Sequence, residues 1–189
     1  MGDLRKAAFL DRDGVINIDS GYVFKWEDFV FTTGALDALR SLIEHDFTLV
    51  IVTNQSGIAR GLYSEDDFHR LTNRMLAEMR KFGVDVAAVY KCPHYLHGLV
   101  PTYSIDCNCR KPKPGMILQA LHELDINPDR SVMIGDKVSD KLAADAAGIR
   151  DFYFMSNLPV SDKSKVTFLG TPYATLKECV AQILSKNGE

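Results

Sequence analysis

The sequence lacks long apolar runs and has little excess of charge of either sign. No stretch approaches the roughly 18 apolar residues that cross a bilayer, and the apolar run near the start is too short for a signal peptide. The 22 Lys and Arg residues and the 25 Asp and Glu residues give a net charge of -3, so there is no global positive field to hold a nucleic-acid backbone. We therefore expect a cytoplasmic protein that binds neither a membrane nor a nucleic acid.

Internal repeats and low-complexity tracts are also absent from the sequence. The chain has 189 residues, little more than the roughly 150 of a typical domain. Hydrophobic residues make up 46% of it and charged residues 25%, with a mean hydropathy of -0.08. Such a composition can bury a sizeable core. We predict a single globular domain over residues 1–189.

Short apolar runs alternate with segments in which apolar residues recur at helical spacing. The apolar runs predict strands at 7–10, 48–53, 84–90, 131–134, 151–155 and 166–169. The helical spacing predicts helices at 35–43, 64–82, 116–124, 139–147 and 175–184. Because strands that alternate with helices need right-handed crossovers, the predicted fold class is α/β, a three-layer sandwich around a mostly parallel, Rossmann-like sheet.

Polar residues stand at the ends of three predicted strands. Asp11 and Asp13 follow the first strand, Thr53 and Asn54 end the second, and Asp136 follows the fourth. In parallel sheets, ligands bind outside the carboxyl ends of the strands. An Asp-x-Asp sequence alone is often a solvated turn. Three strand ends together predict an oxygen-rich pocket that suits Mg²⁺.

A basic pair, Arg110 and Lys111, precedes the predicted helix at 116–124. Such a pair in a loop is by itself more often a solvated surface than a site. Here it accompanies a strand-end hydroxyl and several carboxylates, and guanidinium, ammonium and helix N-terminal N–H groups all bind phosphate. The combination predicts a site for a phosphorylated ligand.

Cysteine is scarce, yet three of the four cysteines lie within residues 92–109. Cys92 and His94 form one close pair of ligands, and Cys107 and Cys109 form another, which together match a tetrahedral structural zinc site. Disulfide pairing is the alternative, but two of these cysteines are too close in sequence for an easy bridge and the expected compartment is reducing. All four ligand positions are filled, so no place remains for a zinc-bound water. We predict a structural Zn²⁺ that fixes the adjacent basic pair.

Four ordered motifs resemble those of the haloacid dehalogenase (HAD) superfamily of aspartate-nucleophile phosphatases. They are Asp11-Arg12-Asp13-Gly14-Val15, Thr53, Lys111 and Gly135-Asp136-x-x-x-Asp140, and the resemblance covers nearly the whole chain. It implies that Asp11 attacks phosphorus to form an aspartyl-phosphate and that Asp13 acts as general acid and base. It also implies that Thr53 and Lys111 hold the transferring group. Mg²⁺ would be bound by Asp11, the backbone carbonyl of Asp13, and Asp136.

Within the superfamily, residues 53–61, 92–94 with 107–112, and 135–137 resemble the sugar bisphosphate phosphatases. The resemblance implies removal of the C7 phosphate of a heptose 1,7-bisphosphate, a small-molecule substrate, in the biosynthesis of nucleotide-activated heptose. Since only residues 17–33 separate the first motif from the first predicted helix, no large cap domain is expected. The implied substrate contacts are Asp19, Ser20, Gly21, Tyr22, Asn54, Gln55, Ser56, Arg110 and Lys137.

Two other functions remain open at this point. A histidinol-phosphate phosphatase would share the aspartate pair and a similar zinc loop, although residues 54–61 favour the heptose substrate. A catalytically silent module that binds a phosphorylated sugar would share the fold, but all four motif positions carry competent residues. The sequence shows no obvious exposed apolar stripe, so we expect a monomer.

Overall fold

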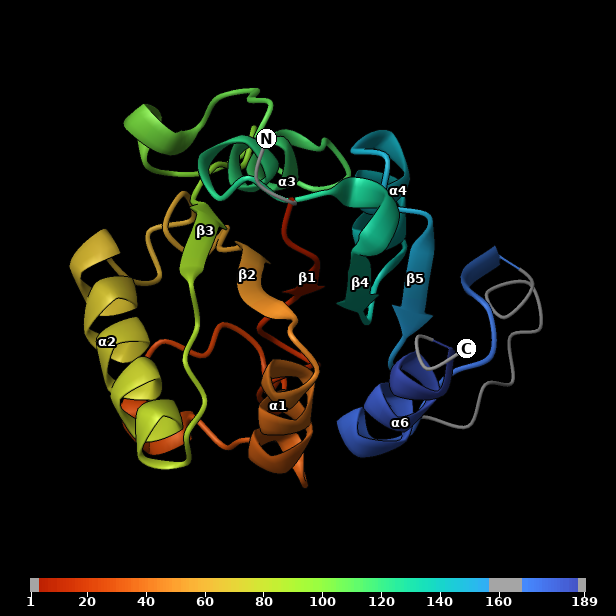
Figure 1. The fold of residues 1–189 in the computed structure, drawn as a ribbon. Helices are drawn as coiled ribbons and strands as arrows, with labels where there is room; N and C mark the ends of the chain where they lie inside the picture. The colour runs from red at the N-terminus through yellow and green to blue at the C-terminus, as the bar shows by residue number, and fades with distance from the viewer. Residues whose placement is uncertain (1–3, 157–167, 187–189) are drawn as a thin grey trace.

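The computed structural model describes residues 4–156 and 168–186, and within them the chain forms a five-stranded sheet (Figure 1). The strands are β1 (Ala7–Leu10), β2 (Thr48–Asn54), β3 (Ala88–Cys92), β4 (Val132–Gly135) and β5 (Asp151–Phe154), all parallel, in the order β3-β2-β1-β4-β5. The helices are α1 (Ala35–Glu44), α2 (Glu65–Lys81), α3 (Gly115–Glu123), α4 (Val138–Ala146) and α6 (Leu176–Lys186). The predicted α/β class with a parallel sheet is confirmed.

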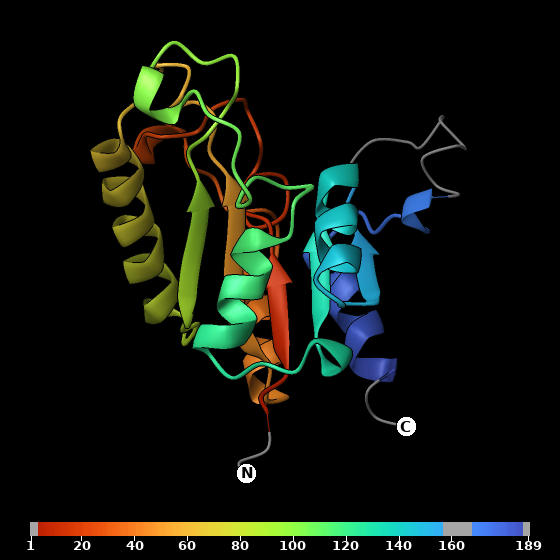
Figure 2. The same cartoon turned by 90° about the horizontal axis from the view of Figure 1, so that it is seen from above.

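Helices cover both faces of the sheet (Figures 1 and 2). In β1, Ala8 and Leu10 pack in one hydrophobic cluster with residues of α1, α2 and α6, whereas Ala7 and Phe9 pack in a second cluster with residues of α3 and α4. All four side chains are fully buried, which explains why this strand is an unbroken apolar run rather than an alternating one. The predicted three-layer sandwich is confirmed.

The third strand begins later than predicted. Residues 84–90 are the predicted strand, but pairing with β2 begins where Ala88 lies opposite Val50. Val84 and Val86 are buried in the core before the chain reaches the sheet, so their apolar character reflects packing rather than strand pairing. The shift puts the first cysteine of the cluster at the carboxyl end of β3.

The strand predicted at 166–169 is wrong where the structure describes it. Phe168 and Leu169 are helical, while residues 166 and 167 lie outside the described part of the chain. A short apolar run does not by itself distinguish a strand from a helix. The chain instead returns to the edge of the sheet through a single bridge between Met155 and Tyr173.

The longest described helix, α2, begins at a capping box. The N–H of Asp67 donates to Ser64 Oγ (3.1 Å), and the N–H of Ser64 donates to Asp67 Oδ2 (2.8 Å), which satisfies two N–H groups of the first turn. The helix has 17 residues and is rich in charged side chains. No helix in the described residues is both long and apolar enough to cross a membrane.

The strand order brings three strand ends together. Because β1 lies between β2 and β4, the residues that follow these strands meet at one edge of the sheet. The loop that follows β3 also reaches this edge (Figure 2). In the described ranges, loops and short 3-10 turns such as Trp26–Asp28 stand here, and no large cap domain does.

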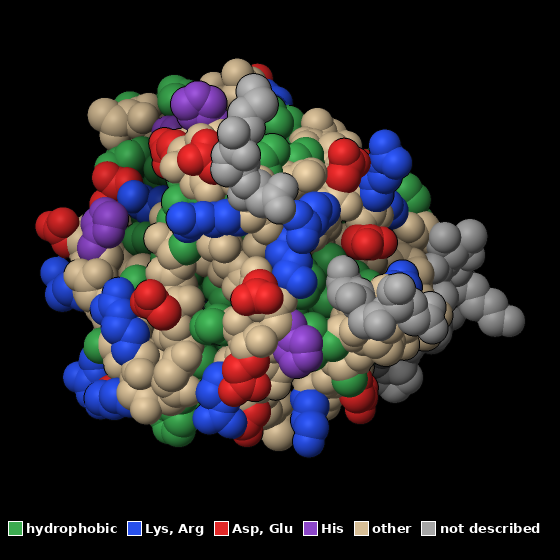
Figure 3. All heavy atoms as spheres, in the orientation of Figure 1, with side chains coloured by type: hydrophobic (Ala, Val, Ile, Leu, Met, Phe, Trp, Pro, Cys, Tyr) green, Lys and Arg blue, Asp and Glu red, His purple; other side chains and the backbone are tan. Residues whose placement is uncertain are grey.

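The surface carries mixed charge. On the face in Figure 3, Lys and Arg side chains lie among Asp and Glu side chains, with no broad area of one sign. This face agrees with the small net charge of -3.

Candidate active site

Asp11 lies directly after β1, where its N–H donates to the carbonyl oxygen of Ile134 in β4 (3.0 Å). Its Oδ1 lies 3.1 Å from Lys111 Nζ and accepts a hydrogen bond from the N–H of Arg12 (2.8 Å). Burial raises the pKa of Asp11, and the Lys111 ammonium offsets part of that rise. The end of the central strand therefore holds a buried carboxylate against a fixed cation.

Three groups hold the ammonium of Lys111. Its Nζ lies 3.1 Å from Asp11 Oδ1 and 2.7 Å from Asp140 Oδ1, and it donates to the carbonyl oxygen of Val52 (2.7 Å). Burial lowers the pKa of Lys111, but the two carboxylates more than offset this, so its pKa lies above the ordinary value. The predicted substrate residue Asn54 also accepts from the N–H of Lys111 (3.1 Å) and donates to its carbonyl oxygen (3.0 Å). Asn54 therefore fixes the backbone of the lysine.

Asp11, Asp136 and Asp140 form a carboxylate trio, with one oxygen of each within 4.8 Å of the others. Burial and the nearby Asp11 raise the pKa of Asp136 to about 7, and its Oδ1 is buried without a hydrogen-bond partner. Three carboxylates face two ammonium groups, the buried one of Lys111 and the half-exposed one of Lys137 (3.4 Å from Asp136 Oδ2), so the carboxylates are in excess. This oxygen-rich, anionic set fits a divalent cation such as Mg²⁺. The sequence predicts Asp11 and Asp136 as ligands, and the fold brings Asp140 beside them.

Gly14 makes the close approach of the first and fourth strand ends possible. Its φ is +90°, a left-handed conformation that favours glycine, and a Cβ at this position would lie 2.4 Å from Asp136 Oδ2. A side chain here would therefore both strain the turn and displace a carboxylate of the trio.

The carboxylate of Asp13 accepts hydrogen bonds from three side chains. Arg12 Nη2 donates to both of its oxygens (3.0 and 2.9 Å), Asn17 Nδ2 to Oδ1 (3.0 Å) and Gln55 Nε2 to Oδ2 (3.0 Å). Arg12 is only 1% exposed, so its guanidinium is a fixed part of the site. The sequence gives no expected role for Arg12 or Asn17. A basic residue between two strand-end acids is the signal that could have identified Arg12.

Gln55 connects this group to the second strand. Its Nε2 donates to Thr53 Oγ1 (2.9 Å), while its Oε1 accepts from Tyr63 OH (2.5 Å) and Arg12 Nη2 (3.3 Å). Tyr63 is buried and its ring stacks on Phe24 with centroids 5.0 Å apart. Burial raises the pKa of the Tyr63 phenol, which keeps it a hydrogen-bond donor. No sequence pattern marks Tyr63, a single aromatic residue in a turn.

A cavity of about 400 Å³ opens beside these groups. Eight of the nine substrate contacts implied by the sequence line it, whereas the exposed Ser20 does not. Tyr63 and Ser139 line the cavity without having been predicted. The lining residues are Asp13, Asp19, Gly21, Tyr22, Asn54, Gln55, Ser56, Tyr63, Arg110, Lys111, Lys137 and Ser139.

Lys137 joins the loop after β1 to the trio. Its Nζ lies 3.3 Å from Asp19 Oδ2 and 3.4 Å from Asp136 Oδ2. The N–H of Gly21 donates to Asp19 Oδ1 (3.0 Å), which shapes the exposed turn at the rim. Two lysines, Lys111 and Lys137, therefore line the cavity.

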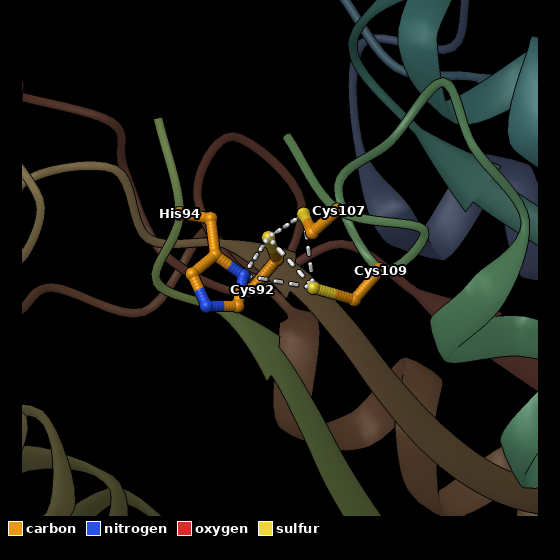
Figure 4. Close-up of side chains that lie close together, drawn as sticks. All are labelled: Cys92, His94, Cys107 and Cys109. Atoms are coloured by element: carbon orange, nitrogen blue, oxygen red, sulfur yellow. Dashed lines mark hydrogen bonds between the residues drawn. The ribbon is translucent and has the colours of Figure 1, made fainter. Parts of the chain in front are cut away.

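The four predicted zinc ligands converge at the end of β3 (Figure 4). Cys109 Sγ lies 3.0 Å from Cys92 Sγ, 3.3 Å from Cys107 Sγ and 3.3 Å from His94 Nδ1, and Cys92 Sγ lies 3.6 Å from Cys107 Sγ. Ligand atoms of a tetrahedral zinc site with Zn–S bonds of about 2.3 Å lie about 3.8 Å apart, close to this arrangement. All four cysteines of the chain are free thiols. The disulfide alternative is therefore not what the structure contains.

The cysteine loop is attached to the cavity through Arg110. Its Nη1 donates to the carbonyl oxygen of His94 (3.1 Å), and the residue follows Cys109 directly in the chain. The guanidinium is half-buried and lines the cavity. The position of this cation therefore depends on the conformation of the loop.

Known proteins resemble most of the chain. A HAD-hydrolase-like family model matches residues 108–156. The chain is 48% identical over 163 residues to the D-glycero-beta-D-manno-heptose-1,7-bisphosphate 7-phosphatase of Pasteurella multocida (strain Pm70), covering 86% of this chain and 88% of the relative. It is 41% identical over 176 residues to the D-glycero-alpha-D-manno-heptose-1,7-bisphosphate 7-phosphatase of Photorhabdus laumondii, covering 93% and 96%.

A solved structure agrees with these relatives. The D,D-heptose 1,7-bisphosphate phosphatase from B. bronchiseptica, complexed with magnesium and phosphate, is 30% identical to this chain with a TM-score of 0.78. The match covers 96% of this chain and 99% of that one.

Proposed function

The chain belongs to the D-glycero-D-manno-heptose-1,7-bisphosphate 7-phosphatases of the HAD superfamily, and from this premise we propose how its residues carry out the reaction. It is a Mg²⁺-dependent sugar bisphosphate phosphatase that removes the C7 phosphate of the heptose 1,7-bisphosphate, a step in heptose biosynthesis. We propose that residues 1–189 form one phosphatase domain.

The observation that carries the proposal is the buried pair of Asp11 and Lys111 beside the cavity. The pair lies 3.1 Å apart next to the carboxylate trio, and the cavity of about 400 Å³ falls within the range of small-molecule sites. A nucleophile, a cation and a place for a metal therefore meet where a phosphorylated sugar can enter.

In the first step Asp11 attacks phosphorus. Both of its fixed contacts fall on Oδ1, so Oδ2 is the oxygen that would form the new bond to phosphorus while the bond to the sugar oxygen breaks. Thr53 Oγ1 accepts from Gln55, which leaves its own hydroxyl hydrogen for a phosphoryl oxygen. The Lys111 ammonium neutralises charge on the same group.

Asp13 handles the protons of both steps. It would give a proton to the departing sugar oxygen and then take one from the water that attacks the aspartyl-phosphate, which breaks the bond between phosphorus and Asp11. The three donors on its carboxylate, from Arg12, Asn17 and Gln55, hold it at the cavity wall. Asp13 thus faces the leaving group without being part of the trio.

The carboxylate trio is the proposed Mg²⁺ site. Asp11 and Asp136 would hold the ion together with the backbone carbonyl of Asp13, and the unpartnered Asp136 Oδ1 supports this assignment. A bound Mg²⁺ supplies positive charge between the phosphoryl group and the nucleophile, which otherwise repel each other. Asp140 contributes by holding Lys111.

The rest of the substrate would contact the cavity rim. Arg110 and Lys137 provide cations, the turn at 19–22 provides polar groups, and Asn54, Gln55 and Ser56 provide hydrogen bonds. The monomeric state expected from the sequence stays a prediction. Free thiols fit a reducing compartment, which supports a cytoplasmic location.

Zn²⁺ is the proposed occupant of the cysteine site. Three thiols and one imidazole, with ligand atoms 3.0 to 3.7 Å apart, suit a closed tetrahedral ion without a reactive water. The ion would hold the loop that ends at Arg110 and Lys111.

The Asp11→Asn variant tests the proposal, because an amide is a poor nucleophile. We expect its hydrolysis of heptose 1,7-bisphosphate to fall to background, measured as phosphate released. The matched control is Asp37→Asn, an exposed aspartate of α1, which should keep the activity of the parent. Residual activity of Asp11→Asn within about tenfold of the parent, or faster hydrolysis of histidinol phosphate than of the bisphosphate by the parent, would refute the proposal.

A further inference from the structure

Two guanidinium groups, one of them from the cavity-lining Arg110, lie over one tyrosine ring. The Arg60 Cζ lies 3.9 Å from the centroid of the Tyr95 ring, and the Arg110 Cζ lies 5.4 Å from it. Both distances fall within the roughly 6 Å at which a cation is attracted by the face of an aromatic ring. We call Arg60, Tyr95 and Arg110 the Tyr95 stack.

The loops that carry the stack are tied to each other. The N–H groups of Leu99 and Val100 both donate to the carbonyl oxygen of Ala59 (2.7 and 2.9 Å). A Cβ on Gly98 would lie 2.4 Å from the same oxygen, so the two backbones approach as closely as glycine permits. The loop of Tyr95 and the turn that carries Arg60 therefore form one unit.

The Tyr95 ring is the described contact of the Arg60 guanidinium. Its Nε is buried without a hydrogen-bond partner, and the face of Tyr95 is the group that its guanidinium contacts most closely among the described contacts. Because an unpaired buried donor is costly, the contact with the ring keeps Arg60 in place. The same contact restricts rotation of the Tyr95 side chain.

Arg110 has few other restraints. The one hydrogen bond of its side chain within the described residues is from Nη1 to the carbonyl oxygen of His94, the residue that precedes Tyr95. One hydrogen bond leaves a planar guanidinium free to pivot, and the ring face restricts that pivot. Two cations within a Debye length of about 10 Å also repel each other, and an anion bound by Arg110 relieves that repulsion.

We propose that Tyr95 is a specificity-determining positioning residue, which with Arg60 holds Arg110 against the second phosphate of the substrate, the one that is not transferred. The inference rests on the proposed function. Since the transferred phosphate is held by other residues, the stack affects only substrates that carry a second phosphate.

The test compares two substrates, the heptose 1,7-bisphosphate and the same sugar with its C7 phosphate but a free hydroxyl at C1. In Tyr95→Leu we expect kcat/KM for the bisphosphate to fall about 3- to 30-fold, the range of one cation–aromatic contact, with little change for the monophosphate. Tyr95→Phe keeps the ring face and should behave as the parent. Arg60→Met should lower the ratio of kcat/KM for the bisphosphate to kcat/KM for the monophosphate by a smaller factor than Tyr95→Leu does. Zinc content should equal that of the parent in every variant.

Equal losses for the two substrates in Tyr95→Leu would overturn the inference, as would a loss in Tyr95→Phe as large as in Tyr95→Leu. Loss of zinc from Tyr95→Leu would also overturn it, because the effect would then come from the metal site. An unchanged ratio of the two kcat/KM values in Arg60→Met would overturn the role proposed for Arg60. If the parent does not hydrolyse the bisphosphate, the proposed function fails before any variant is compared.

Discussion

One buried amide, that of Gln55, orients two groups of the proposed reaction at once. Its nitrogen donates to Asp13 and Thr53, so its oxygen must face Arg12 and Tyr63. In a flipped amide, the oxygen would face the Asp13 carboxylate, and the nitrogen would face the donors of Arg12 and Tyr63. The hydroxyl of Tyr63 therefore acts on the site through Gln55.

Tyr63→Phe removes the only donor that Tyr63 offers to Gln55 Oε1. We expect kcat to fall about 2- to 10-fold, the worth of one ordinary hydrogen bond, with KM nearly unchanged because the bond does not touch the remote part of the substrate. Burial raises the pKa of Tyr63 above its ordinary value of about 10. The hydrogen bond is therefore fully present below about pH 10 and is lost only as the pH rises through the raised pKa.

The pH dependence gives this prediction its check. The ratio of parent to variant kcat should stay constant from about pH 6 to 9, since the phenol remains protonated throughout. Tyr90→Phe is the control, because Tyr90 OH donates to the exposed Glu123 instead (2.7 Å) and its loss should leave kcat unaltered. A ratio that changes within that pH range would mean that Tyr63 titrates during the reaction.

At the scale of an element, the loop after β3 has little regular secondary structure, and the four side chains of the cysteine–histidine cluster lie at its two ends. Between Cys92 and Cys109 the described chain has one short 3-10 turn, Pro101–Tyr103, and no helix or strand. Such a loop is expected to be mobile unless its ends are tied together. The ligand cluster ties them, next to Arg110 and Lys111.

Cys107→Ala is expected to release zinc and lower kcat/KM. Displacements of about 1 Å in the positions of Arg110 and Lys111 make losses of about 100-fold plausible. Metal analysis beside kcat/KM measures both effects. Cys179→Ala is the matched control, because Cys179 is buried in the core on α6 and should keep its zinc and its kcat/KM even where Tm falls. Stoichiometric zinc in Cys107→Ala would show that the cluster is not the closed site proposed.

At the scale of the whole molecule, the sheet order concentrates charge. Asp11 follows the central strand and Asp136 follows its neighbour β4, while Asp140 comes from the first turn of α4. Three carboxylates face two ammonium groups, those of the buried Lys111 and the half-exposed Lys137, so the site keeps a negative excess when all of them are ionised. A divalent cation should therefore stabilise the fold as well as enable the reaction.

Mg²⁺ is expected to raise Tm by about 5 to 10 °C at about 100 times its Kd, which corresponds to about 2.7 kcal/mol for a chain of this size. Thermal unfolding of protein freed of Mg²⁺ by gel filtration, with and without added Mg²⁺, measures this. Asp136→Asn should abolish most of the rise, whereas Asp145→Asn, on the exposed face of α4, should keep it. An equal rise in both variants would place the ion elsewhere.

Local patterns in the sequence predict much of the fold and of the candidate site of this protein. The apolar run of β1 ends at Asp11 and Asp13 because a strand buried on both faces must be continuous and its end must be polar. The spacing of Cys92, His94, Cys107 and Cys109 predicts their convergence. The same reasoning misplaced the start of β3, since buried Val84 and Val86 have the composition of a strand without its pairing.

The sequence by itself determined the fold class, the strand ends that carry carboxylates and the donor types of the two proposed metal sites, because each depends on residues close together in the chain. Only the tertiary structure decided that Tyr63 orients Gln55, that Asn54 holds Lys111 and that Asp140 joins Asp11. Lys111 is 57 residues from Asn54. Contacts across such separations depend on strand order and register, which arise from packing over the whole sheet and leave no local pattern in the sequence.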